Sequence, residues 1–183
     1  MEYLKEEIAK RFVSQHILVY LLDELEVYVF DDKLAIAEFW RPNKATLYVG
    51  KPGEVEEVYE LDIEERKRNE SVFTFLRDKL FAERLELLPI MEKLREMLRL
   101  SLVNIVIRDR EETRGGELIE LALALSWGFM EKTWLFVRKE IAISSMVNFL
   151  LLSRHGHKMD YIDQEDLLGK CLQLIRSYMY PKS

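Results

Sequence analysis

The sequence predicts an α/β protein: a doubly wound, three-layer sandwich with a five-stranded, mostly parallel sheet, preceded by a helix and a β-hairpin. Two observations support this fold class. Residues 102–107 and 134–137 are short apolar runs separated by a loop with two glycines and a helical stretch, the pattern of one βαβ unit. From residue 45 to residue 180, strand-like and helix-like runs also alternate. Such alternation predicts parallel strands joined by crossover helices.

Composition limits the class of protein. The 183 residues are enough for one domain with a sizeable core, and 49% hydrophobic and 33% charged residues are typical of an ordered globular protein. The net charge of −6 argues against nucleic-acid binding. No apolar run is long enough for a membrane span, and the first residues do not resemble a signal peptide, so we expect a cytoplasmic protein without a membrane partner. Cys171 is the only cysteine, and the abundance of Glu, Lys and Arg resembles thermophile proteins.

Residues 1–44 are expected to form an N-terminal appendage to an α/β domain at 45–183. Apolar residues four positions apart predict a helix over residues 2–13. Residues 17–22 either continue that helix or begin a strand. Two β-rich runs around a short polar turn, at residues 25–40, predict the hairpin.

Residues 45–50 are predicted to be the first strand of the parallel sheet, and the following nine-residue run is a further strand or a lid. A helix is expected over 71–81. Residues 83–99 allow two interpretations: one long helix kinked at Pro89, or a short strand at 84–88 and a new helix that begins at the proline. We prefer the second because it completes the regular alternation.

The rest of the chain continues the pattern. The 102–107 strand is followed by a helix that opens at Glu117, and a second strand ends near Val137. Ser144 and Ser145 are expected to cap a helix. A last strand precedes Asp163, which is predicted to cap the final helix together with a carboxylate three positions on.

The loops at the carboxyl ends of the strands should share one edge of the sheet, where ligands of open α/β sheets bind. Glycines, hydroxyls, charges and helix N-termini at such an edge suit an anionic or polyhydroxyl ligand. The same residue types are also common in ordinary turns and caps. The candidate substrate-binding residues are Lys51, Gly53, Asp109, Gly115, Gly116, Arg138, Ser144 and Ser145.

Two carboxylates at the start of the central helix are the candidate catalytic groups. Glu117 and Glu120 are predicted to lie in its first turn, where the helix dipole favours the ionised form that a nucleophile needs. Acidic residues are also favoured in any first helical turn, whatever their role.

The segment GGELIELALAL, after a buried strand, resembles the Gly-Thr-x-x-Glu-x-Gly-x-Ala segment of nucleoside 2-deoxyribosyltransferases. Their relatives include nucleotide N-glycosidases and, more distantly, TIR-domain NADases. Gly115-Gly116 matches the loop, Glu120 the catalytic glutamate, and Ala122 and Ala124 the small residues. The segment TLYVGKPG at 46–53 is similar to the opening strand and turn of that group. Leu102 and Asn104 depart from it, because the family often has Asp there.

This resemblance implies a flavodoxin-like fold and a nucleoside- or nucleotide-processing N-glycosidase or deoxyribosyltransferase without a cofactor. Glu120 would attack the anomeric carbon and form a covalent sugar–enzyme intermediate. Arg138 or Lys139 would hold a phosphate of a nucleotide substrate. The alternative is a non-catalytic nucleotide-sensing or protein-interaction module. Its homodimer contact would be an apolar face of the hairpin that includes Phe39.

No metal site is expected. His155 and His157 lie in a loop before a strand, which places them on the edge opposite the ligand edge, and no third ligand is nearby. Asp32 and Glu38 faintly resemble the carboxylates of restriction-type nucleases, but Trp40 stands where such sites need a lysine. Glu38 is therefore expected to be an ordinary outward-facing strand residue.

Overall fold

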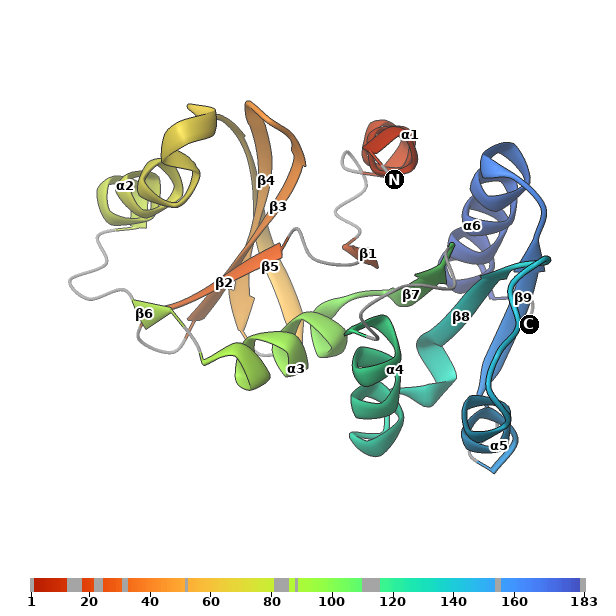
Figure 1. The fold of residues 1–183 in the computed structure, drawn as a ribbon. Coiled ribbons are helices and arrows are strands. Elements are labelled where there is room, and N and C mark those ends of the chain that lie inside the picture. The colour runs from red at the N-terminus through yellow and green to blue at the C-terminus, as the bar shows by residue number, and fades with distance from the viewer. Residues whose placement is uncertain are drawn as a thin grey trace. The chain divides into compact units, whose positions relative to one another are not determined.

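The structure is a computed structural model (Figure 1), which describes residues 2–12, 18–21, 25–30, 33–51, 53–80, 86–87, 89–109, 116–153 and 156–181. The chain divides into two compact units. Unit 1 is Met1–Leu18 with Asp23–Leu100, and unit 2 is Val19–Leu22 with Ser101–Ser183. Each unit contains its own sheet, and the two sheets differ in kind.

Unit 1 is built on an antiparallel sheet whose strands follow one another through tight turns. Its centre is formed by β2, β3 and β4, and β5 and the two-residue β6 lie at its edges. The β3–β4 and β4–β5 connections are only two residues long, which is possible only between antiparallel neighbours. In spatial order the strands are β5 (Glu54–Asp62), β4 (Lys44–Lys51), β3 (Lys33–Arg41), β2 (Leu25–Phe30) and β6 (Glu86–Leu87).

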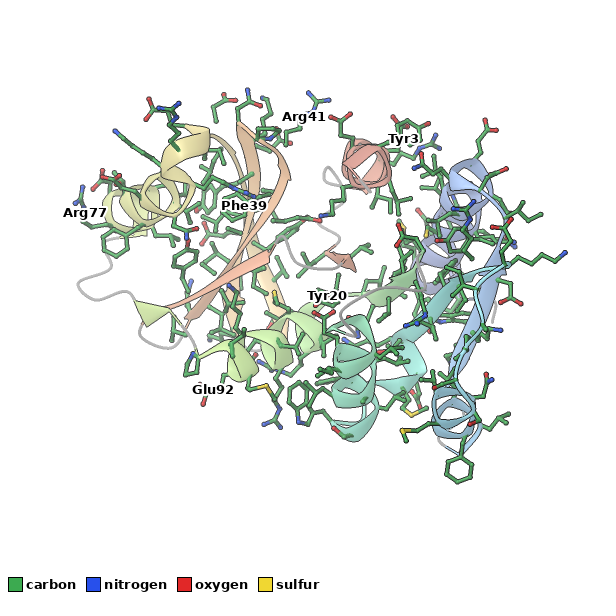
Figure 2. All side chains as sticks on the ribbon, in the orientation of Figure 1. Tyr3, Tyr20, Phe39, Arg41, Arg77 and Glu92 are labelled. Atoms are coloured by element: carbon green, nitrogen blue, oxygen red, sulfur yellow. The ribbon has the colours of Figure 1, made fainter. Side chains whose placement is uncertain are left out.

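Helices cover both faces of this sheet. The helix α2 (Arg68–Leu80), which follows the short 3₁₀ turn η2 (Glu65–Lys67), packs on one face through Val72 and Leu76. Phe39 projects from β3 into this core, and the guanidinium of Arg68 lies 4.2 Å from the centre of its ring (Figure 2). The helix α1 (Glu2–Phe12) contacts β3 on the other side, and α3 (Ile90–Leu100) contacts β2.

Arg41 fastens α1 to the end of β3. Arg41 is labelled in Figure 2, and its Nε lies 3.2 Å from the carboxylate of Glu6. Leu4 and Ile8 of the same helix are buried. The apolar residues four positions apart, which predicted the N-terminal helix, therefore form the face of α1 that packs inward. The prediction of this helix is confirmed.

Unit 2 contains four parallel strands in the order β1-β7-β8-β9. Crossover helices that connect strands added in one direction across a sheet lie on one face, because such connections are almost always right-handed. Accordingly α4 and α5 share one apolar cluster with β7 and β8, and α6 packs on the other face. The elements are β1 (Val19–Leu21), β7 (Val103–Arg108), α4 (Gly116–Ser126), η3 (Met130–Lys132), β8 (Thr133–Arg138), α5 (Ser145–Ser153), β9 (His157–Tyr161) and α6 (Gln164–Met179).

The predicted single five-stranded, mostly parallel, flavodoxin-like sheet is wrong. The strand expected to open it, β4, lies in the antiparallel sheet between β3 and β5. The residues from Ala45 to Gly50 are all buried, since helices cover the sheet on both sides. That uninterrupted burial gives β4 the apolar pattern typical of a parallel strand. The boundary predicted between residues 44 and 45 falls at the start of β4, directly after its turn from β3.

Two undecided segments are resolved. Residues 19–21 form a strand, β1, which pairs Val19 with Val103 in parallel. The preferred interpretation of 83–99 is confirmed as to its helix: α3 begins at Ile90, and the carbonyl of Pro89 accepts a hydrogen bond from the Lys93 amide at 2.9 Å. Its strand, β6, pairs with β2 in unit 1, whereas residues 81–85 and 88 lie outside the described residues.

Candidate functional site

The carboxyl edge of the parallel sheet is the predicted ligand edge, and several of the described candidate residues of unit 2 lie along it. There β7, β8 and β9 end at Arg108, Arg138 and Tyr161. The strands are in register, with Arg108 opposite Val137 and Arg138 opposite Tyr161, so their ends lie side by side. Asp109 follows β7 directly and is half-buried.

Tyr161 is the enclosed polar group of this edge. Its side chain is buried, and its hydroxyl lies 3.5 Å from the carbonyl oxygen of Arg108. Burial raises the pKa of Tyr161 to about 12, the carboxylate of Asp109 adds to this, and the guanidinium of Arg138 opposes it. The hydroxyl therefore stays protonated near neutral pH, and it donates its hydrogen bond to the Arg108 carbonyl oxygen. These influences place Asp109, Arg138 and Tyr161 in one electrostatic environment.

Glu120 lies on the helix that leads away from this edge. Its carboxylate atom Oε2 is buried, whereas the adjacent Ile119 is 61% exposed. The helix begins at Gly116, which places Glu120 one position beyond the first turn, where the dipole is weaker than predicted. Gly115 and the side chain of Glu117 lie outside the described residues, so the structure tests neither.

Ser144 and Asp163 serve as helix caps. Ser144 Oγ accepts a hydrogen bond from the Val147 amide at 3.3 Å, and the exposed Ser145 is the first residue of α5. Asp163 caps α6 by accepting from the Asp166 amide at 2.9 Å. Both predicted caps are confirmed, and capping accounts for the Ser144 hydroxyl without a ligand.

Lys51 and Gly53 belong to a different sheet. Lys51 is the exposed last residue of β4, and Gly53, with φ of 92°, forms the tight turn into β5. They therefore do not share the carboxyl edge of the parallel sheet with Asp109 and Arg138. Residues 46–51 of the segment TLYVGKPG, which carries part of the family resemblance, belong to a strand that pairs with β5 in an antiparallel sheet.

Glu38 is a second polar centre, in unit 1, that the sequence did not reveal. Tyr48 donates a hydrogen bond from its hydroxyl to Glu38 Oε2 at 3.0 Å. Burial raises the pKa of Glu38 to about 7, against the lowering effects of this hydrogen bond and of Lys5 on α1. Burial, with the adjacent carboxylate, also raises the pKa of Tyr48. Glu38 is thus not an outward residue, because α1 covers its side of β3. Apolar residues on both faces of the run LAIAEFW were the available signal.

His157 lies where predicted, at the start of β9 and so on the amino edge of the parallel sheet. Its ring stacks on Trp134 with ring centres 4.4 Å apart, and Trp134 Nε1 donates to the Tyr178 hydroxyl at 3.1 Å. Within the described ranges, no group of three side chains is suited to hold a metal ion. Among those same ranges, no helix is long and apolar enough to cross a bilayer.

Comparison of the chain with protein-family models, with curated proteins and with solved structures found no match. Functional inference therefore rests on the chemistry of the residues themselves.

Proposed function

We propose that unit 2 binds a nucleoside or nucleotide at the carboxyl edge of its parallel sheet, and that Glu120 acts on the N-glycosidic bond. The observation that carries the proposal is the half-buried Glu120, with a buried carboxylate oxygen, on the helix that follows this edge. A carboxylate shielded from water is a stronger nucleophile toward an electrophilic carbon than a fully hydrated one. The fragment of the family resemblance that lies on α4 assigns the same residue.

The chemistry is a displacement at the anomeric carbon of the sugar. A carboxylate oxygen of Glu120 forms a bond to that carbon while the bond to the base nitrogen breaks, and the base leaves with the electron pair and takes up a proton. Water, or a second base, then releases the sugar from the enzyme. The Tyr161 hydroxyl donates its hydrogen to the Arg108 carbonyl oxygen, and its oxygen can accept a hydrogen bond from a sugar hydroxyl.

Arg138 is the phosphate-binding candidate at this edge. Its Nε lies 3.1 Å from Glu140, but both side chains are about half or more exposed, so this ion pair is weak and a phosphate can replace it. Arg138→Ala is expected to weaken the binding of nucleotides more than that of nucleosides, because only the nucleotide carries the phosphate.

A second candidate function is ligand binding without catalysis. This function is favoured because β4, which contains most of residues 46–53, lies in the antiparallel sheet. Of the two segments that resemble the enzyme family, only the one on α4 therefore belongs to the parallel sheet and its carboxyl edge. The protein would then act as a nucleotide-sensing module, and Asp109, Arg138 and Tyr161 would serve in binding only.

The decisive experiment is a release assay with nucleosides, nucleotides and NAD, in which free base is measured by chromatography. Wild type should release base from at least one compound, Glu120→Gln should be slower by orders of magnitude, and Glu131→Gln should match wild type. Glu131 is an exposed glutamate of the same unit and so controls for the loss of charge. Equal release by wild type and Glu120→Gln would contradict the catalytic role.

Thermal unfolding with the same compounds separates the two functions. A ligand that binds the folded protein raises the melting temperature whether or not it is cleaved. A shift without release supports the binding module, and neither shift nor release with any compound would contradict both proposals.

A further inference from the structure

The helix α5 is apolar on two sides. Val147 and Leu151 are buried in the core of unit 2, against the strands β7 and β8. On the other side Met146 is 79% exposed, Phe149 71% and Leu152 79%. The burial of Val147 and Leu151 fixes the helix on the sheet, so the exposed side chains are held outward.

These three exposed residues, the α5 patch, form one surface. They follow one another at intervals of three, and residues three apart are neighbours on a helix surface. Three large exposed apolar side chains amount to an apolar area on the order of a few hundred Å², the size at which patches on monomers commonly mark interaction sites. We therefore expect an apolar surface of a partner to cover the α5 patch.

The charge distribution indicates which partner fits. From residue 141 to residue 153 the sequence has no Asp, Glu, Lys or Arg. A helix that lies on a membrane, like a nucleic-acid-binding surface, needs basic side chains beside its apolar face, and α5 has none. A partner recognised through charge likewise finds no counter-charge on the helix.

A second copy of this chain is the partner that this distribution suits. In a twofold contact the same patch lies on both sides, so any charge in it would meet a like charge. The whole chain carries a net charge of −6, so two copies repel one another over most of their surface. At the charge-free α5 segment two copies can approach without bringing like charges of that segment together.

We propose that the α5 patch is the contact between two copies of this chain, with the two α5 helices packed across a twofold axis. Phe149 is the middle residue of the three and lies nearest the axis. A standard stable interface buries about 800 Å² on each partner, so the patch supplies roughly half and the exposed polar residues around it supply the rest. The dimer is therefore of modest affinity, on the order of micromolar. This dimer is independent of the proposed nucleotide chemistry.

Sedimentation equilibrium of the full chain from about 1 to several hundred micromolar tests the proposal. Wild type should pass from monomer to dimer over this range. Phe149→Glu places two like charges near the axis and should weaken dimerisation at least tenfold, because a central aromatic side chain is lost from both copies. Ile119→Glu, at an apolar residue of α4 that is 61% exposed, should dimerise as wild type does.

Other results would overturn the proposal. A wild-type protein that stays monomeric over the whole range has no such contact. Dimers of undiminished affinity in Phe149→Glu, with circular dichroism unchanged, place the contact elsewhere. Equal loss in Ile119→Glu and Phe149→Glu shows general surface association rather than a contact at α5.

Cross-linking adds a second measurement, because a disulfide traps the dimer even when only part of the protein is dimeric. Cys171 is the only native cysteine and is buried, so an introduced cysteine reacts alone. Asn148→Cys replaces an exposed residue beside Phe149 and keeps all three residues of the patch, so it should form a disulfide-linked dimer under mild oxidation, faster than Ile119→Cys by at least tenfold. Equal rates for the two variants would contradict a twofold contact at α5.

Discussion

The half-buried Glu38, whose pKa is raised, should make the stability of unit 1 depend on pH, and Glu38→Gln should remove that contribution. The carboxyl accepts a hydrogen bond from Tyr48 at 3.0 Å and lies within the influence of Lys5 on α1. Burial is the largest effect on it and raises its pKa from 4.5 to about 7. A neutral amide keeps the size of the side chain and the oxygen that accepts from Tyr48, but it cannot ionise.

The sign and size of the change in unfolding free energy with pH follow from the protons that the folded and unfolded states bind. Between pH 4.5 and about 7 the folded protein holds the Glu38 proton and the unfolded chain has lost it, so stability falls as pH rises through this range. One unit of pKa shift corresponds to about 1.4 kcal/mol, so the full effect has an upper bound of about 3 kcal/mol. Below pH 4.5 the protonated Glu38 resembles glutamine. Relative to wild type, Glu38→Gln should therefore gain up to about 3 kcal/mol between pH 4.5 and pH 8.

Urea unfolding of both proteins at several pH values measures this difference, with circular dichroism as the signal. Hydrogen exchange of the β3 and β4 amides assigns the effect to unit 1. Glu57→Gln is the matched control: Glu57 accepts a hydrogen bond from Tyr59 on the same sheet, but in an exposed position. It controls for the loss of one carboxylate and one tyrosine–glutamate hydrogen bond.

One outcome would refute the reasoning. If the stabilities of wild type and Glu38→Gln differ by the same amount at every pH from 4.5 to 8, ionisation of Glu38 is not linked to folding. A difference that changes equally in Glu57→Gln would assign the effect to net charge rather than to burial.

Three further predictions concern other parts of the fold. A Cβ on Gly50 would lie 1.9 Å from the carbonyl oxygen of Glu54, so Gly50→Ala should lower the free energy of unfolding in urea by about 2–4 kcal/mol. Gly169 lies in α6 with open space around it, so Gly169→Ala should raise that free energy by up to about 1 kcal/mol. Asp163→Ala removes the α6 cap and should cost about 1 kcal/mol, seen as a lower melting temperature. Burial raises the pKa of the Cys171 thiol to about 12, so a thiol reagent at pH 8 should modify it only after unfolding, and rapid labelling of the native protein would contradict its enclosure.

Local order in unit 2 could be predicted from the sequence. The run from β7 to α6 follows the expected succession of strands and helices, and Ser144 and Asp163 cap the helices as predicted. These features depend on signals within a few residues: apolar periodicity, and side chains that accept from amides three positions on. The adjacency of the Asp109 and Arg138 loops follows equally from two consecutive parallel strands.

The partition of strands between two sheets could not be read from periodicity. A strand buried on both faces looks alike in a parallel and in an antiparallel sheet, and β4 is buried throughout from Ala45 to Gly50. The signal that distinguishes them is the length of its connections. Only Pro42 and Asn43 separate it from β3, and only residues 52–53 separate it from β5. A parallel neighbour needs a crossover of a dozen residues or more, so these turns alone require antiparallel pairing.

The long-range pairing of β1 had no local signal. It has three residues and pairs Val19 with Val103, so its neighbour in the sheet lies beyond the whole of the antiparallel sheet in sequence. A strand this short has too few residues for periodicity to distinguish it from a helical turn. Its assignment depends on contacts that no window of sequence contains.

The strand order also changes what locates the candidate site. In doubly wound sheets a ligand crevice forms where the strand order reverses direction, because neighbouring connections then lie on opposite faces. Among the described strands of unit 2 the order β1-β7-β8-β9 follows the sequence without a reversal, and α4 and α5 share one face. Topology therefore does not single out a crevice at β7. What distinguishes this edge is its side chains: Asp109, Arg138 and the enclosed Tyr161 hydroxyl, with Glu120 on the following helix. Substitution of Glu120 and Arg138 consequently tests the site more directly than any further comparison of folds.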